Sequence, residues 1–252
     1  MRQGTRRDLV VVAAFLAALV AGGCEMQVDL GVDVERNGSG RVAVAVDLDA
    51  EAADRLPDLG DQLRLDDLEA AGWEIEGPTA TAGGSTVLSA TRAFATPEEA
   101  TRVLRDVGGA GGPFQGLEVA RRSSFLTTDY TFTGAVDLAA GVEAFADDEL
   151  RRLFEGSGFS LGTADLEQAI GAPVDETFFF EVRATLPGSI TVEGTGVEDG
   201  AGAVWNPVVG ERLILAASSE TLHRQRVAWL ALSSAAFLAI VVVVVVGYRR
   251  RR

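Results

Sequence analysis

Alternating apolar and polar residues predict a β-hairpin near the start of the chain. From Met26 to Val34 every second residue is apolar and the residues between are polar or glycine, which is typical of a strand with one buried face. Asn37-Gly38-Ser39-Gly40 supplies turn-forming residues, and the alternation resumes from Val42 to Leu48. We therefore expect two antiparallel strands whose apolar side chains share one face.

Helical periodicity predicts amphipathic helices between the strands. Leucines with roughly helical spacing stand at Leu56, Leu59, Leu63 and Leu68. Thr96-Pro97-Glu98-Glu99 is the strongest start signal, because Thr96 can cap a helix, proline suits the first helical position and Glu99 completes a capping box. This helix should end at the glycines from Gly108. An apolar stripe over residues 142–154 predicts another helix, ended by Gly156.

The remaining segments alternate with the period of strands. Short strands are expected over residues 73–81 and 86–94, a long half-buried strand over 126–138, and further strands between residues 178 and 217. Hairpins interrupted by helices are typical of an α+β domain. We predict that residues 24–222 form an antiparallel β-sheet with two or three amphipathic helices on one face.

The first 24 residues have the composition of a lipoprotein export signal. Arginines precede about a dozen apolar residues, too few to cross a bilayer, and small residues then lead to Cys24. We expect residues 1–23 to be a signal peptide and Cys24 to be the lipid-attachment site. An ordinary signal cleaved nearby, with Cys24 incidental, is the alternative. The adjacent Arg6 and Arg7 also leave the twin-arginine export route open.

An uncharged apolar run near the C-terminus predicts a transmembrane helix. Residues 227–247 would extend about 31 Å as a helix, enough to cross the hydrocarbon core. Trp229 and Tyr248 would lie near the two interfaces, and the arginines of residues 248–252 would form a basic cytoplasmic tail. The sequence thus predicts a single-pass cell-membrane protein with its domain on the extracytoplasmic face.

Charge narrows the classes of partner. The chain has a formal net charge of −15, and residues 24–222 contain 13 arginines, no lysine and 36 aspartates or glutamates. Nucleic-acid binding needs a basic footprint, so we expect no nucleic-acid partner. The single cysteine cannot form a disulfide within the chain, and a domain of this length can bury a core without one.

One short motif invites an enzymatic interpretation. Gly158-Phe159-Ser160-Leu161-Gly162 fits the nucleophile-elbow pattern, and Asp165 or Asp175 followed by His223 could complete a triad in chain order. A strand should precede such an elbow, whereas a helix is predicted here. A serine hydrolase acting through Ser160 therefore remains only a remote alternative. No motif for a metal, a phosphate or a cofactor is present, and we expect a protein that is not an enzyme.

Aromatic and basic residues on the predicted strands are the candidates for a binding surface. The aromatic residues expected mainly in the core are Phe125, Phe132, Phe178, Phe179, Phe180 and Trp205. Phe179 departs from the pattern, because alternation puts it on the face opposite Phe178 and Phe180, where it could line a ligand cleft. Arg121 and Arg122 form a basic doublet that could meet an anionic head group. A solvated strand edge is the simpler interpretation of this doublet.

Several of these segments together resemble the LppM family of actinobacterial envelope lipoproteins. The resemblance lies in Cys24 followed by Val28-Asp29-Leu30-Gly31-Val32, the turn at residues 37–40, Trp205-Asn206-Pro207 with Gly210, and the apolar segment with a basic end. It implies an α/β domain displayed outside the membrane, acylated at Cys24, with a role in binding lipids or glycolipids of the envelope.

Two functions follow for a membrane-anchored lipoprotein of this kind. The first is a non-enzymatic module that binds an envelope lipid or glycolipid, favoured by the attachment to the membrane, the half-apolar sheet and the family resemblance. The second is a protein-interaction subunit of an envelope complex, which would use the acidic surface. The sequence identifies neither the ligand nor a protein partner.

Overall fold

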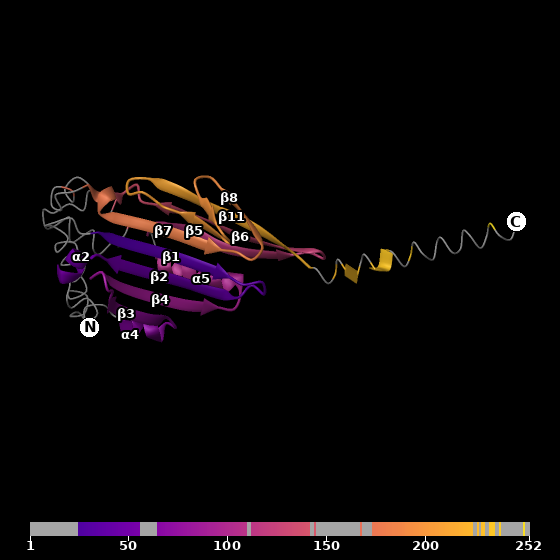
Figure 1. Cartoon of the computed structure of the whole chain (residues 1–252), viewed down its shortest axis with the longest axis horizontal. Coiled ribbons are helices and arrows are strands. Elements are labelled where there is room, and N and C mark those ends of the chain that lie inside the picture. Colours follow the sequence, from indigo (N-terminus) through magenta and orange to yellow (C-terminus); the bar gives the residue numbers. More distant parts are fainter. Residues whose placement is uncertain are drawn as a thin grey trace.

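The computed structural model shows a domain made mostly of β-strands in two sheets (Figure 1). It describes residues 25–55, 65–109, 112–141 and 173–223, together with isolated positions at 144, 167 and between 226 and 249. The strands of the larger sheet, in spatial order, are β3 (Glu74–Ala80), β4 (Thr86–Phe94), β2 (Gly40–Leu48), β1 (Met26–Val34), β7 (Phe178–Thr185), β10 (Gly202–Trp205) and β9 (Val197–Asp199). Those of the smaller sheet are β5 (Phe114–Ser123), β6 (Thr127–Asp137), β11 (Arg212–Leu222) and β8 (Ser189–Glu193).

The predicted hairpin forms the middle of the larger sheet. β1 and β2 are antiparallel in the register Leu30↔Val44, and Leu30, Val32 and Val42 are buried on the inner face. The other edge of β1 pairs in parallel with β7, which comes from the far part of the chain, in the register Met26↔Phe178. Two long-range pairings therefore meet at β1.

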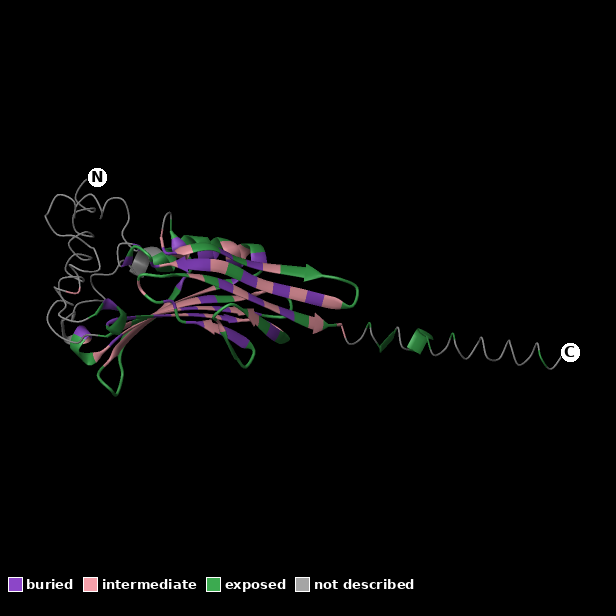
Figure 2. Ribbon diagram, turned by 90° about the horizontal axis from the view of Figure 1, so that it is seen from above, coloured by how far each residue is buried: buried purple, intermediate pink, exposed green. Residues whose placement is uncertain are grey.

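The inner faces of the two sheets share one core. Phe132 of β6 packs against Trp205 of β10, with ring centroids 5.8 Å apart. The indole lies so close to Gly196 that a side chain there would clash with it, so glycine is required at that position. Buried positions run along the facing strands (Figure 2). Trp205 thus joins the two sheets across their interface.

Helix α5 (Pro97–Gly108) begins as the sequence predicts and lies beside the edge strand β5, packed against β2 and β4 of the larger sheet. The Glu99 amide donates to the Thr96 hydroxyl at 3.3 Å, and the Glu99 carboxylate accepts from the Ala95 amide at 2.8 Å. Val103 and Leu104 are buried in the common core. On the helix face toward β5, the Thr101 hydroxyl accepts a hydrogen bond from the Val119 amide at 3.1 Å.

The predicted fold class is wrong in its architecture. Two sheets are present where one was expected, and the other α-helices described, α2 (Ala50–Arg55) and α4 (Leu65–Ala70), are short. Alternation shows which face of a strand is buried but not which sheet the strand joins, and this is why the second sheet was missed. The helix predicted over residues 142–154 lies almost wholly outside the described residues.

The predicted transmembrane helix is not supported either. No helix within the part of the chain that the structure describes is long and apolar enough to cross a bilayer. Most of residues 227–247 lie outside that part, as do residues 1–23 and Cys24.

Candidate functional site

Three phenylalanines begin strand β7 and alternate as the sequence predicts. Phe178 and Phe180 are buried toward the core, whereas Phe179 is 42% exposed on the opposite face. In the parallel register with β1, Phe179 lies beside Gln27. Most of the exposed aromatic surface at this end of the larger sheet thus comes from Phe179.

A proline ends the strand that would otherwise continue beside these phenylalanines. β10 pairs with β7 only from Gly202 opposite Thr185 to Trp205 opposite Val182. Pro207 follows, and because it has no amide hydrogen and restrains the preceding residue, it is unsuited to a strand interior. Residues 206–209 are therefore in no strand and form a wall next to the start of β7.

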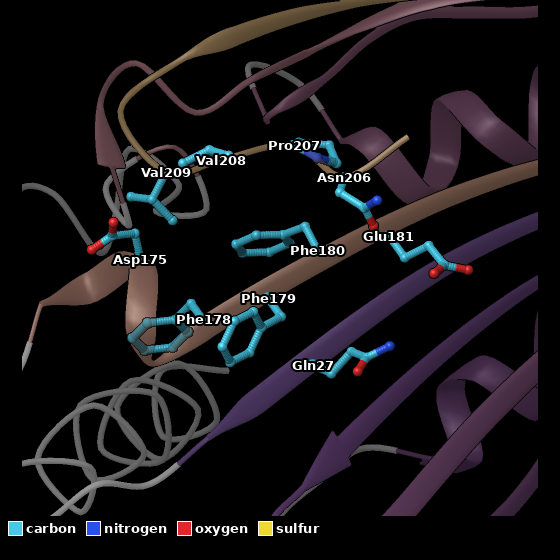
Figure 3. Close-up of a pocket in the computed structure, with 10 residues that line it drawn as sticks. All are labelled: Gln27, Asp175, Phe178, Phe179, Phe180, Glu181, Asn206, Pro207, Val208 and Val209. Carbon is cyan, nitrogen blue, oxygen red and sulfur yellow. The ribbon is translucent and has the colours of Figure 1, made fainter. Parts of the chain in front are cut away.

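The space between this wall and β7 is a pocket of about 430 Å³ (Figure 3). It is lined by Gln27, Asp175, Phe178, Phe179, Phe180, Glu181, Asn206, Pro207, Val208 and Val209. In Figure 3 the rings of the three phenylalanines lie near one another, and Val208 and Val209 face them from the other side. Gln27, Glu181 and Asn206 lie together at the polar end, away from Asp175. The pocket is therefore an aromatic and aliphatic space with polar groups at its margins.

Hydrogen bonds hold the polar margin in place. The Gln27 amide nitrogen donates to the Asp29 carboxylate at 2.8 Å. Arg183 donates to Glu181 at 3.1 Å and to Asp199 at 2.6 Å. Arg183 therefore neutralises the Glu181 carboxylate at the pocket margin and joins it to Asp199 of β9.

The electrostatic character of this margin is acidic. Partial burial raises the pKa of Asp29 above its ordinary value of 3.8, and the nearby Glu181 and Asp47 carboxylates add to the shift, while the hydrogen bond from Gln27 and the charge of Arg183 oppose it. No arginine is among the described residues that line the pocket. The pocket thus offers amides and carboxylates, which suit hydroxyl and carbonyl partners better than phosphate.

The structure does not bring the other candidate residues to this pocket. Arg121 and Arg122 lie on β5 in the smaller sheet, whereas Phe179 lies in the larger sheet. The Arg121 guanidinium is 5.9 Å from the centre of the Tyr130 ring, and its side chain also approaches Gly38. Arg122 is exposed opposite Asp129. The basic doublet belongs to another part of the surface.

The hydrolase alternative gains nothing from the described residues. Ser160 and Asp165 lie outside them, as does Cys24, the predicted lipid-attachment site. The His223 Nε2 atom contacts the Thr128 hydroxyl at 3.2 Å at the start of β6, whereas Asp175 lines the pocket at the start of β7. Within the described part of the chain, no group of His, Cys, Asp and Glu is placed to hold a metal ion.

Sequence reasoning missed most of the residues that surround Phe179. Gln27 alternates on β1 as an ordinary polar residue, and its position beside Phe179 depends on the parallel pairing of β1 with β7. The Asn206-Pro207 step did carry a usable signal, because a proline directly after a strand marks a point where an adjoining strand loses its neighbour.

Comparison with known proteins gives one remote likeness of fold. No family model matches the chain, and no curated protein matches it. Among solved structures, the NMR structure of the folded domain of LppM from Mycobacterium tuberculosis is similar with a TM-score of 0.42 and 9% sequence identity. The likeness covers 81% of this chain and 95% of that domain.

Proposed function

We propose that this chain is a non-enzymatic module of the cell envelope that binds an envelope lipid or glycolipid through an apolar chain held in the pocket at Phe178–Phe180. The observation that carries the proposal is the pocket itself, which has aromatic and aliphatic walls and a polar margin at one end. Its volume of about 430 Å³ lies within the range of about 300–1,000 Å³ found for small-molecule sites.

Apolar contact supplies most of the expected affinity. Each methylene removed from water contributes about 0.8 kcal/mol, so four buried methylenes give about 3 kcal/mol, or roughly a hundredfold in affinity. Phe179 matters most here, because it is the exposed member of the three phenylalanines and a bound chain would cover it. A ligand with a hydrocarbon portion is favoured over a wholly polar one.

The margin of the pocket sets the expected head group. The Gln27 and Asn206 amides can both donate to and accept from hydroxyl groups. The Asp175 carboxylate accepts hydrogen bonds from hydroxyls but repels a phosphate, whereas the Glu181 carboxylate is already paired with Arg183. Of the two ligand classes, a glycolipid with an uncharged, hydroxyl-rich head therefore fits better than an anionic phospholipid.

Direct binding to the purified full chain tests this function. The probe is a fluorescent fatty acid, displaced by dodecyl glycosides and, separately, by a dodecyl phosphate. We expect saturable binding that the glycoside displaces at lower concentration than the phosphate. Mass spectrometry of the protein purified from its own membranes should also detect a retained lipid.

Two tryptophan variants show where the probe binds. Val208→Trp fills the pocket and should weaken binding at least about tenfold, since it excludes the chain that contributes the apolar free energy. Val197→Trp adds the same side chain at a position outside the pocket that is 62% exposed, and should leave binding unchanged. Absence of saturable binding, or equal affinities in both variants, would refute the proposed function.

A further inference from the structure

The turn between β5 and β6 carries exposed apolar side chains on a hydrogen-bonded backbone. We use the name hairpin tip for residues 123–126 with the adjoining Leu222, His223 and Arg226. Phe125 is 63% exposed, and Leu126 and Leu222 are exposed beside it. Phe125 was expected in the core, and that prediction is wrong because the residue lies in the turn and not within a strand.

Hydrogen bonds fix the shape of the hairpin tip. The Ser124 amide donates to the Thr127 carbonyl at 2.8 Å, and the Thr127 amide donates back to the Ser124 hydroxyl at 3.0 Å. From the neighbouring strand, the His223 amide donates to the Leu126 carbonyl at 2.8 Å. Phe125 and Leu126 are therefore held at the apex of a closed turn and are presented to solvent by a fixed backbone.

An arginine contacts this apex although the chain as a whole is acidic. The Arg226 guanidinium lies 5.6 Å from the centre of the Phe125 ring and donates to the Phe125 carbonyl at 3.2 Å. The last two cross-strand rows, Ser123–Thr128–Thr221 and Ser124–Thr127–Leu222, contain no carboxylate, and the carboxylates of Asp129 and Glu220 lie one row farther back, beside Arg122. A chain of net charge −15 thus places arginine and histidine around its exposed apolar turn.

We propose that the hairpin tip inserts Phe125 and Leu126 into the interfacial layer of an anionic lipid bilayer, with Arg226 at the lipid head groups. Aromatic rings with flanking cations are the combination that such an interface favours. A narrow turn is too small for a standard protein interface, which needs about 800 Å² from each partner. Trp229 comes three residues after Arg226 in the chain and is also 70% exposed.

This surface is distinct from the proposed ligand pocket. Figure 1 shows the β5–β6 turn at the end of the domain where β11 finishes, whereas β7 begins at the opposite end. The register agrees, since Leu222 lies opposite Thr127 in the smaller sheet. Insertion of the hairpin tip into a bilayer therefore does not depend on ligand binding in the pocket.

Quenching of a single introduced tryptophan by spin-labelled lipids tests the inference on the full chain. The Trp229→Phe background leaves Trp73 and Trp205, both buried, as the native signal. Phe125→Trp reports on the tip, and Val197→Trp reports on an exposed position away from it. With phosphatidylglycerol-containing vesicles we expect quenching at position 125 and none at position 197. Equal quenching at both positions, or none at position 125, would overturn the inference.

A charge reversal and a cysteine variant complete the experiment. Arg226→Glu should abolish the quenching at position 125, whereas Arg212→Glu, at the other end of β11, should not. Cys24 adjoins Glu25 at the opposite end of the domain, where an acyl group would favour the reverse orientation. If the tip orients the domain as proposed, an acyl group does not reverse it, and quenching at position 125 should be the same with Cys24 and with Cys24→Ser. Its appearance only in Cys24→Ser, or crosslinking of the tip to a protein without lipid quenching, would contradict the proposal.

Discussion

The two ends of this domain expose phenylalanine in opposite electrostatic surroundings. At the pocket end, Phe179 lies in a hollow bordered by Asp175 and Glu181. At the hairpin end, Phe125 lies on a projection with Arg226 stacked over its ring. The apolar contribution is similar in the two places, so the neighbouring charges decide the kind of ligand. Carboxylates and amides favour a hydroxyl-rich molecule, whereas arginines favour an anionic surface.

The two ends also differ in how the chain builds them. The pocket results from an interruption, because Pro207 ends β10 and leaves room beside the start of β7. The hairpin tip forms where strand pairing is uninterrupted, because β5 and β11 both remain paired with β6 up to the turn. A substitution that affects one end should therefore spare the other, unless it acts on the core that joins them.

Removal of the Trp205 side chain should have the largest effect, because it connects the sheets that carry the two ends. Trp205→Ala should lower the free energy of unfolding by about 3–5 kcal/mol and weaken both the pocket and the hairpin tip. Denaturant unfolding measures this loss. Trp205→Phe is the matched control and should cost less, since the indole nitrogen donates to no partner in the described part of the chain. A loss confined to one end would contradict this coupling.

Loss of one buried hydroxyl group should destabilise the hairpin end of the domain more than the pocket end. The Tyr130 hydroxyl donates to the Arg36 carbonyl and so ties β6 to the β1–β2 turn. Tyr130→Phe should cost about 1–2 kcal/mol and speed amide hydrogen exchange at that turn and along β6, while the start of β7 keeps its protection. Thr101→Val removes a hydroxyl group that bonds α5 to β5 instead, and it is the control for the loss of a single hydrogen bond elsewhere in the domain. Equal acceleration at both ends in Tyr130→Phe would show that they do not respond separately.

Neutralising Asp29 should have the smallest effect and should depend on pH. The pKa of Asp29 is raised in the folded protein, mainly by burial, so the folded state binds its proton more tightly than the unfolded state does. Stability contributed by this group therefore falls as the pH rises from about 3.8 through the raised pKa. Asp29→Asn should raise the free energy of unfolding at pH 7 by at most about 0.5 kcal/mol, with no gain below pH 3.8.

Glu98 provides a control of opposite sign for this measurement. Hydrogen bonds from its own backbone amide and from Thr96 lower the pKa of its carboxyl at the start of α5. Glu98→Gln should therefore reduce stability at neutral pH, and the difference should disappear as the carboxyl of the native protein is protonated in acid. Thermal unfolding between pH 3 and pH 8 compares the two variants. The same sign of change in both would contradict the assigned causes.

Local signals in the sequence were sufficient for single elements but not for their assembly. The capping residues of α5 and the turn after β1 depend on neighbours in the chain, and both elements form where predicted. The parallel pairing of β1 with β7 could not be predicted, because half-buried strands show the same alternation in parallel and antiparallel pairs.

The candidate site shows the same division. Alternation alone was enough to single out Phe179 as a residue facing away from the core. Its grouping with Arg121 and Arg122 does not occur, since those arginines belong to the other sheet. Asn206 and Gln27 reach Phe179 only through long-range pairing, which no local pattern contains. A site at the meeting point of three distant segments requires the tertiary structure.

The length of β11 sets the distance between the pocket and the hairpin tip. Its 11 residues, at about 3.3 Å each, extend about 36 Å from the pocket end to the hairpin end. With the hairpin tip resting on a bilayer, the pocket opens well beyond the head-group layer of that bilayer. A ligand in the pocket would then be bound at a distance from that bilayer. In the proposed arrangement the strands act as a spacer between the bilayer and the bound ligand.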